Sequence, residues 1–499
     1  MLTLFNHSRN LHRVLPAIAA AAGLPLAASA QSQAPTKADL SDEDIRDAIT
    51  DDLFYSSAID ASNVEVTVSN GIATLEGETK TLLAKQRAIR TAQSIRGVTS
   101  VIDRVTVRPT AREDAKLVRD INTELATDPA TESFEIRVTA EDGLVTLEGE
   151  VESGAEKFLA EHNAASIHGV TGIDNRIEVN PLPGRTDADI ITDVNGMLEA
   201  SVWIDSGLIH ASVENGRVDL DGTVSSTAER LAAIRAAYVE GVSLVTADDL
   251  IVTPILPSDM KKWPADPAPI DDNTIDQSIE TAMKLDPRVS SYAVYTGVDD
   301  GAVTLRGVVP TLSAKQAAET IARHTAGVER VRNNIRLDPQ TETTDQRIAE
   351  ALRKSLTRDA TLSDQAVRVT VDDLIVSLDG TVATAHEKWH ATSLAARIPG
   401  VIRVNNDLDT LYDWEWQTDA EIGEDIRDQL YWSPFVDSTD LTVSVTNGIA
   451  TVSGTVDDYG ELSAVRDNAF EGGAKDVRLA LTYPSGNTAE GGVMTDAGN

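Results

Sequence analysis

Cysteine is absent from the 499 residues, which excludes disulfides, thiolate metal sites and thiol nucleophiles. Aromatic residues make up only 4% of the chain, so its cores must be built mostly from Val, Ile, Leu and Ala. Basic residues are scarce too, because 43 Lys and Arg face 80 Asp and Glu, for a formal net charge of −37. Neutralising nucleic-acid phosphates needs clustered Lys and Arg, so this balance argues against a nucleic-acid binder. The hydrophobic content of 41% is nevertheless too high for a wholly disordered chain.

Long apolar runs are also lacking, and the N-terminus holds the longest. Residues 1–30 contain no acid, and Arg9 and Arg13 precede an apolar, alanine-rich stretch over residues 14–26. Small residues at 28–30 complete the pattern of a secretory signal peptide, which we expect to be cleaved after residue 30. A membrane anchor is the alternative, but the stretch is shorter than the roughly 20 residues required and contains two prolines. We therefore expect export to the periplasm, with a peripheral position at the outer or inner membrane as one option.

One phrase recurs six times along the chain: alternating apolar residues, a turn, alternating apolar residues again, and a closing glycine. The copies cover residues 64–77, 136–149, 209–222, 294–307, 367–380 and 441–454. Period-two alternation predicts half-buried strands, and an Asn-Gly turn such as Asn70-Gly71 is typical of tight hairpins. The fifth copy has Asp373-Leu374 at this place. Because leucine is strained at positive φ, we expect that turn to differ or to carry a local cost.

A helical pattern stands on each side of every phrase. In the first copy, Ile45, Ile49 and Leu53 share one face of the preceding helix, and the following helix ends at Gly97-Val98. A final strand comes next, although the sixth copy has Gly472-Gly473 and a weaker pattern for that strand. The unit is therefore αββαβ, and the predicted fold class is α+β, with two helices packed on one face of a three-stranded sheet.

The spacing of the copies predicts the domain order. The expected parts are a signal peptide (1–30), six repeats (41–108, 112–181, 186–254, 271–338, 343–411 and 418–483), a proline-rich linker (255–270) between the third and fourth repeats, and a disordered tail (484–499). We expect the linker to separate two rigid groups of three repeats. The recurring glycines are expected to serve the fold: Gly71, Gly77, Gly97, Gly149, Gly169, Gly222, Gly241, Gly307, Gly327, Gly380, Gly400 and Gly454.

The repeated phrase, the Gly-Val after the second helix and the order of elements resemble the BON-domain family. The resemblance covers residues 41 to about 483, nearly the whole chain after the leader. It implies an αββαβ fold, export to the periplasm or outer membrane, and attachment to phospholipid surfaces with roles in envelope integrity and osmotic stress. It implies no catalytic residues and no cofactor.

A zinc-protease pattern, H-E-x-x-H, occurs at His386, Glu387 and His390. Two histidines one helical turn apart can ligate zinc, with the glutamate as general base. The segment falls within the second helix of the fifth repeat, however, and sibling repeats have the same helix without these residues. We therefore expect no metal site and no enzyme, and keep the metalloprotease as a remote alternative.

The first repeat is locally basic. Between Thr79 and Arg112 there are eight basic residues and a single acid, Asp103. Basic residues near an anionic membrane contribute about 1 kcal/mol each, so the expected lipid-binding residues are Lys80, Lys85, Arg87, Arg90 and Arg96. A solvated helix face, or pairing with acidic neighbouring repeats, is the alternative.

The expected partners are an anionic phospholipid or membrane surface and envelope proteins, while the oligomeric state stays open. Trp203, Tyr431 and Trp432 lie near repeat ends and are candidates for membrane contact or for caps of the local core. The preferred hypothesis is a non-enzymatic periplasmic protein that attaches to the envelope and supports it under stress. The alternative is a protein-binding scaffold or chaperone-like stress protein.

Overall fold

The computed structural model describes residues 40–57, 63–131, 135–253, 270–290, 292–338, 343–410 and 417–483. All of them belong to one compact unit of the chain, Pro35–Asn499. The predicted signal peptide, the tail and nearly all of the linker lie outside the described residues. Within the described residues, no helix combines the length and apolar character needed to cross a bilayer.

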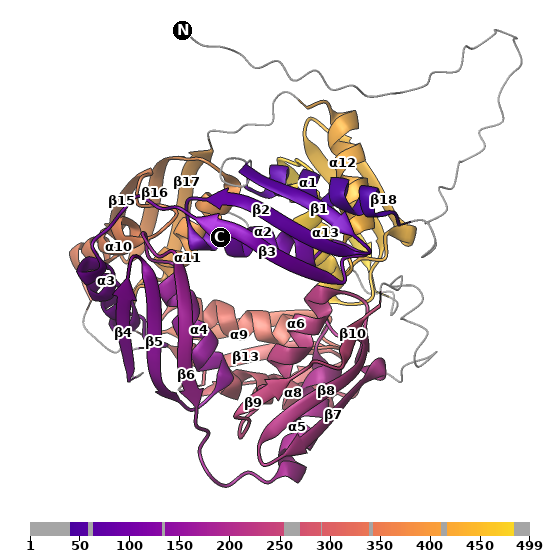
Figure 1. Cartoon of the computed structure of the whole chain (residues 1–499), viewed down its shortest axis with the longest axis horizontal. Helices are drawn as coiled ribbons and strands as arrows, with labels where there is room; N and C mark the ends of the chain where they lie inside the picture. The colour runs from indigo at the N-terminus through magenta and orange to yellow at the C-terminus, as the bar shows by residue number, and fades with distance from the viewer. Residues whose placement is uncertain are drawn as a thin grey trace, which may run out of the picture. The chain divides into compact units, whose positions relative to one another are not determined.

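The first repeat consists of α1 (Asp42–Ser57), β1 (Val64–Ser69), β2 (Ile72–Thr79), α2 (Leu82–Gln93) and β3 (Ser100–Val107). Strands β1 and β2 pair antiparallel as a hairpin, and β3 pairs parallel with β2. Helix α1 packs on β1 and α2 on β3, and Figure 1 shows both helices on one side of the sheet. This confirms the predicted αββαβ unit and the α+β class.

The other repeats follow the same order of elements. The second has α3 (Asp114–Thr127), β4 (Ile136–Glu141), β5 (Leu144–Val151), α4 (Gly154–Ala165) and β6 (Gly172–Val179). The fifth has α10 (Asp345–Arg358), β15 (Ala366–Asp372), β16 (Ile375–Val382), α11 (Ala385–Arg397) and β17 (Arg403–Thr410). The sixth has α12 (Asp419–Trp432), η4 (Ser438–Asp440), β18 (Leu441–Thr446), β19 (Ile449–Thr455), α13 (Tyr459–Glu471) and β20 (Asp476–Thr482). Strand β20 pairs parallel with β19, so the sixth repeat keeps its last strand despite the weaker pattern.

The third and fourth repeats each have one divided strand. The third has α5 (Asp187–Ala200), η3 (Ser206–Leu208), β7 (Ile209–Glu214), β8 (Arg217–Val224), α6 (Thr227–Ala236), β9 (Leu244–Thr246) and β10 (Leu250–Val252). The fourth has α8 (Asp272–Leu285), β11 (Val294–Tyr295), β12 (Val298–Asp299), β13 (Ala302–Val309), α9 (Leu312–Arg323) and β14 (Arg330–Leu337). In both, the divided pieces pair with the same central strand, so the sheet order is kept.

Each repeat has its own apolar core. In the first repeat, Ile49 of α1, Leu75 of β2 and Ala92 of α2 are fully buried together. The core of the second repeat extends into the first, because Leu82 and Val107 of the first repeat join it. The hydrophobic effect thus holds each small unit together and also links some of them.

The twelve glycines expected to serve the fold all have positive φ. Gly77 shows why the closing glycine is needed. Its φ is 144°, and a Cβ atom added there would lie 2.0 Å from the carbonyl oxygen of Asn63. The equivalent glycines of the other five repeats face a backbone oxygen in the same way. The position therefore admits no side chain.

A carboxylate holds the hairpin turn in every repeat. Asp42, the first residue of α1, accepts hydrogen bonds from the backbone N–H groups of Asn70 (2.8 Å) and Gly71 (2.9 Å). We call this arrangement the aspartate clip. The same pair of bonds is made by the first residue of the first helix in the other five repeats: Asp114, Asp187, Asp272, Asp345 and Asp419.

The aspartate clip explains the unusual turn of the fifth repeat. Asp345 binds the N–H groups of Asp373 and Leu374, at 3.2 and 2.9 Å. Both turn residues have positive φ, 50° and 64°, close to the values at the Asn-Gly turns. The turn therefore does not differ in conformation, and leucine occupies a left-handed position that costs about 1–2 kcal/mol.

Hydrogen bonds also join pairs of repeats, two of them far apart in the sequence. The N–H groups of Arg96, His168 and Ala326 donate to the carbonyl oxygens of Trp432, Arg358 and Ala200, respectively. These bonds link the first repeat to the sixth, the second to the fifth, and the third to the fourth. The expectation of two separate groups of three repeats is therefore wrong, because two of these contacts cross from one group to the other outside the linker junction.

Candidate functional site

The H-E-x-x-H segment lies in the first turns of α11, where its glutamate caps the helix. The hydroxyl of Thr384 accepts a hydrogen bond from the N–H of Glu387 (3.2 Å), and the Glu387 carboxylate accepts from the N–H groups of Ala383 (2.5 Å) and Thr384 (3.4 Å). This is a capping box, which satisfies N–H groups that the helix leaves unbonded. The glutamate is committed to the helix end, which is not the position of a general base facing a substrate.

His390 is equally committed. Its Nε2 atom lies 2.7 Å from Oδ2 of Asp359, and the two side chains belong to residues that are only 7% and 2% exposed. The other oxygen of Asp359 accepts from the N–H groups of Thr361 and Leu362 at 2.8 and 2.9 Å. Among the described residues, no three His, Cys, Asp or Glu side chains are placed to hold a metal ion. The motif thus serves a helix cap and a buried hydrogen bond.

Two of the five expected lipid-binding residues are engaged within the protein. The ammonium group of Lys85 donates to the carbonyl of Val105 (2.7 Å) and lies 2.8 Å from Asp103. Arg96 is 5% exposed, and its Nη2 atom donates to the carbonyl oxygens of Ser433 (2.9 Å) and Val436 (3.2 Å). Lys85 is partly buried and Arg96 buried, and both hold structure together.

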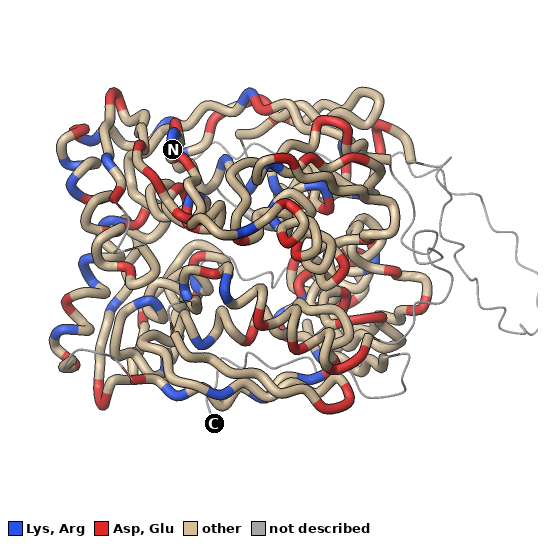
Figure 2. Tube along the Cα trace, turned by 90° about the horizontal axis from the view of Figure 1, so that it is seen from below, with Lys and Arg blue, Asp and Glu red and all other residues tan. Residues whose placement is uncertain are grey.

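The other three expected residues differ in their surroundings. Lys80 is exposed, beside the end of β3, where Arg108 N–H donates to the Thr79 carbonyl at 2.7 Å. Arg87 interacts electrostatically with Glu471 of the sixth repeat. Arg90 has an exposed side chain, although desolvation by the surrounding protein and then the charge of Arg235 lower the pKa of its guanidinium. Figure 2 shows basic residues spread among acidic ones along the chain.

The three aromatic residues near repeat ends contact other repeats. Trp203 makes edge-to-face contacts with His324 (ring centroids 5.2 Å apart) and Phe435 (5.0 Å). Trp432 packs against the core of the first repeat, and Tyr431 lies beneath the guanidinium of Arg96, 5.4 Å from its ring centroid. Trp432 thus caps a core, although that of another repeat, while Trp203 and Tyr431 contact side chains of other repeats.

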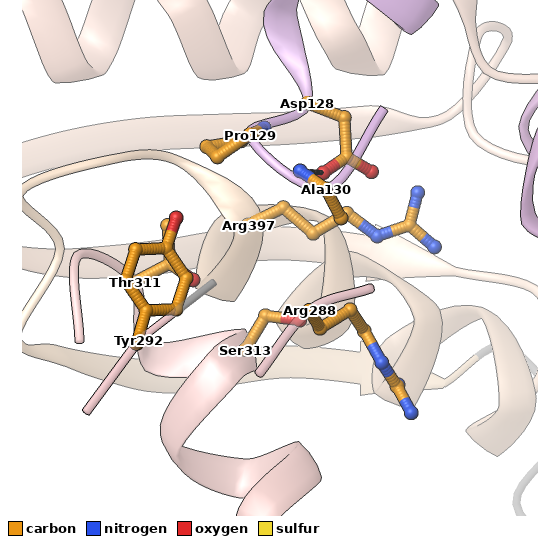
Figure 3. Close-up of a pocket in the computed structure, with 8 residues that line it drawn as sticks. All are labelled: Asp128, Pro129, Ala130, Arg288, Tyr292, Thr311, Ser313 and Arg397. Carbon is orange, nitrogen blue, oxygen red and sulfur yellow. Dashed lines mark hydrogen bonds between the residues drawn. The ribbon is translucent and has the colours of Figure 1, made fainter. Parts of the chain in front are cut away.

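A small polar cavity marks the junction of the second, fourth and fifth repeats (Figure 3). It is lined by Asp128, Pro129, Ala130, Arg288, Tyr292, Thr311, Ser313 and Arg397. Its volume of about 10 Å³ is close to that of a single water site. Arg288 pairs with Asp286 at 2.5 Å, and Arg397 donates to Asn163 at 3.3 Å. With both cations engaged and so little space, the cavity is a packing junction.

A buried charged group next to this cavity joins the second and fifth repeats. Arg358 Nη2 donates to Glu124 Oε2 at 2.9 Å, and Arg397 lies 4.0 Å from the same carboxylate. Burial, assisted by the charges of Arg397 and His390, lowers the pKa of nearby His162 to about 4, so its imidazole is neutral at neutral pH. The arrangement stabilises a contact between repeats.

A larger hollow, of about 380 Å³, lies beside the third repeat. Residues 181–184 form one wall, and the turn residues Asn215 and Gly216 form another. Its one cationic side chain, Arg185, is bonded to Asp193. The hollow contains no group of residues arranged for acid–base or nucleophilic chemistry.

Comparison with known proteins gives one family. The model of the BON domain matches six segments of the chain, residues 41–109, 113–181, 186–254, 271–339, 344–411 and 418–483. A curated relative, osmotically-inducible protein Y of Escherichia coli (strain K12), is 29% identical over 128 residues. That match covers 24% of this chain and 63% of the relative.

Two solved structures also match, at low similarity. One is CdsD, a structural protein of the type III secretion system of Chlamydia trachomatis, with 17% identity and a TM-score of 0.12 over 44% of this chain and 100% of that one. The other is the C-terminal domain of CdsD, with 18% identity and a TM-score of 0.12 over 42% of this chain and 96% of that one.

Proposed function

Because this chain belongs to the BON-domain family, with six tandem copies of the domain, we propose that it is a non-enzymatic, exported protein that attaches to anionic phospholipid surfaces of the cell envelope. In this role it supports the envelope under osmotic stress. The likeness to a relative named for osmotic induction supports the second part. The absence of a matching catalytic family, and the use of Glu387 and His390 in structure, agree with a binding role.

The observation that carries the lipid attachment is the charge of the first repeat. Its basic stretch, with eight cations and one acid between residues 79 and 112, stands out in a chain of net charge −37. Lys80 and Arg90 are the members of the expected site that keep exposed side chains. At physiological ionic strength charges are screened beyond about 8 Å, so a local basic surface can act despite the acidic remainder.

Vesicle sedimentation tests the attachment. The full protein is expected to sediment with phosphatidylglycerol-containing vesicles, less with neutral phosphatidylcholine vesicles, and less at higher salt. Reversing the charge of Lys80 and Arg90 to Glu should weaken binding at least tenfold, since each basic residue contributes about 1 kcal/mol.

The matched control reverses Arg104 and Arg108 instead. These residues are equally exposed and change the net charge by the same amount, but they lie near Glu76 (3.9 Å) and Glu78 (2.7 Å). Equal losses in the two variants would show a general charge effect and no defined site. No binding of the unaltered protein to any vesicle would refute lipid attachment.

A protein-binding scaffold is the second candidate, and one observation favours it. Phe158 and Trp389 are 39% and 57% exposed, and they occupy the same position relative to the glycines that end their helices, Gly169 and Gly400. Exposed aromatic residues are typical of interaction surfaces. Three results together would favour this function. The unaltered chain would retain envelope proteins, the Trp389→Ala variant would lose them, and neither would bind vesicles.

A further inference from the structure

The contacts between distant repeats use one recurring bridge. In it, the end of the second helix of one repeat runs antiparallel to the residues after the first helix of another. Between the second and fifth repeats, the N–H of His168 donates to the Arg358 carbonyl (2.9 Å), and the N–H of Ala360 donates to the Ser166 carbonyl (2.7 Å). Ile167 and Asp359 face each other between these two bonds.

The bridge between the third and fourth repeats has the same two bonds. The N–H of Ala326 donates to the Ala200 carbonyl (2.7 Å), and the N–H of Val202 donates to the His324 carbonyl (3.3 Å). Ser201 and Thr325 face each other, in the places of Asp359 and Ile167. Two pairs of repeats with different side chains therefore meet through an equivalent backbone contact.

The bridge between the first and sixth repeats replaces one bond with a side chain. The N–H of Arg96 donates to the Trp432 carbonyl at 2.9 Å, as in the other bridges. Pro434 occupies the place of Ala360 and Val202, and proline has no N–H to donate. Instead, the guanidinium of Arg96 donates to the carbonyls of Ser433 and Val436. Ala326, at the equivalent position, has no side chain that can do this.

Five of the six helix ends left out of the bridges differ from those that form them, three of these at the second helix. The fifth repeat has Pro399 where the donor N–H belongs. The sixth has Gly472, whose N–H is bonded to Asn468 of its own helix at 2.9 Å. The third has a shorter second helix, α6, of ten residues, against twelve in α4. In the second and fourth repeats, Pro129 and Pro287 take the place of Pro434 and cannot donate, so a bridge there would need a donor side chain opposite, as Arg96 supplies for the sixth repeat.

We infer that two positions in each repeat decide whether its helix ends can form a bridge: the residue before the glycine that ends the second helix, and the second residue after the first helix. The bridges that form pair the first repeat with the sixth, the second with the fifth and the third with the fourth. The partner of each repeat is thus a sibling BON domain that has the complementary helix end. This pairing is independent of lipid attachment.

Cysteine cross-linking tests the pairing, because the chain has no cysteine of its own. Residues that face each other between two antiparallel bonds have Cα atoms about 4.5 Å apart, within disulfide range. The matched variants are Ser201→Cys with Thr325→Cys, and Ile95→Cys with Ser433→Cys. The crossed variants combine the same four substitutions as Ile95→Cys with Ser201→Cys, and Thr325→Cys with Ser433→Cys.

The matched variants are expected to form an internal disulfide on mild oxidation, seen as a shift in non-reducing gel mobility, and the crossed variants to stay reduced. Each cysteine occurs once in each set, so the cost of replacing the buried Ile95 is the same in both. Cross-linking at comparable rates in matched and crossed variants would overturn the proposed pairing.

A rescue experiment tests the two positions themselves. In the Ile95→Cys, Ser433→Cys background, Arg96→Ala is expected to slow disulfide formation at least fivefold, because two bonds to the sixth repeat are lost. Adding Pro434→Ala restores the backbone N–H that the other bridges use, and should recover most of the rate. No slowing by Arg96→Ala, or no recovery with Pro434→Ala, would refute the role of these two positions.

Discussion

Removing one aspartate clip is expected to release the strained turn of the fifth repeat. In the Asp345→Ala variant, two charge-assisted hydrogen bonds to the turn are lost, each contributing about 1 kcal/mol at a partly exposed site. A further loss of about 0.5 kcal/mol comes from removing a negative charge at the N-terminus of α10. Asp373 and Leu374 would then have to hold positive φ without support, at 50° and 64°. The expected destabilisation of the fifth repeat is about 2.5 kcal/mol.

The sixth repeat supplies a matched comparison, because Asp419 makes the same bonds to Asn447 and Gly448, each at 2.8 Å. Glycine adopts positive φ without the penalty that leucine pays in steric clash. The strain at Leu374 is present with and without the clip, so Asp419→Ala should cost about as much as Asp345→Ala but leave its turn about 1 kcal/mol more stable.

Hydrogen exchange followed by mass spectrometry measures each repeat separately within the whole protein. Peptides containing residues 373–374 should exchange faster in Asp345→Ala, and adding Leu374→Gly should restore part of the protection. Equal protection of the fifth and sixth turns once their clips are removed would refute the idea that the clip supports a strained leucine. So would unchanged exchange at the turn.

Three further outcomes are expected. Gly77→Ala should destabilise the first repeat by about 3 kcal/mol, because the added Cβ would meet the Asn63 carbonyl. Gly196→Ala in α5 has open space around it and should be neutral or slightly stabilising. Equal shifts of the melting temperature in the two variants would contradict this. Burial raises the pKa of Asp52, at the contact with the sixth repeat, from 3.8 to about 7, with Gln429 acting in the opposite direction. A raised pKa means that the folded protein binds a proton that the unfolded chain has lost. The stability of the unaltered protein relative to Asp52→Asn should therefore fall as pH rises from about 4 to 7 and level off above. A stability difference that rises with pH would contradict this. His390→Phe should cost about 3 kcal/mol, because it leaves Asp359 buried without its partner. Zinc should not alter the melting temperature of either the unaltered protein or this variant. Stabilisation by zinc of the unaltered protein alone would point to a metal site.

The repeat fold could be predicted from sequence because its signals are local. Period-two alternation, an Asn-Gly or Asp-Gly turn and a helix-ending glycine lie within about twenty residues of one another, and each restricts the backbone by itself. The sequence also contained a signal for the aspartate clip, since Asp42 and its five equivalents stand at the same place in each repeat. Its purpose became clear only when the helix start and the turn were seen side by side.

The fate of the expected site residues could not be predicted in this way. Arg96 reads as one more cation of a basic stretch, but its partners, Ser433 and Val436, lie in the last repeat of the chain. His390 reads as a metal ligand, yet Asp359 had no local pattern to indicate a buried partner. Contacts between repeats depend on single residues such as Pro434, and periodicity along one repeat carries no information about them.

The nested order of the repeat pairs has a consequence for how the molecule is made. A chain is synthesised from its N-terminus, so the third repeat meets its mate as soon as the fourth emerges, whereas the first must wait for the last to arrive. Until then Arg96 lacks the carbonyl oxygens of Trp432, Ser433 and Val436, and the first domain of the nascent chain has that edge uncovered. Assembly therefore proceeds from the middle of the polypeptide outward, and a ribosome that stops early leaves the first domain without its mate.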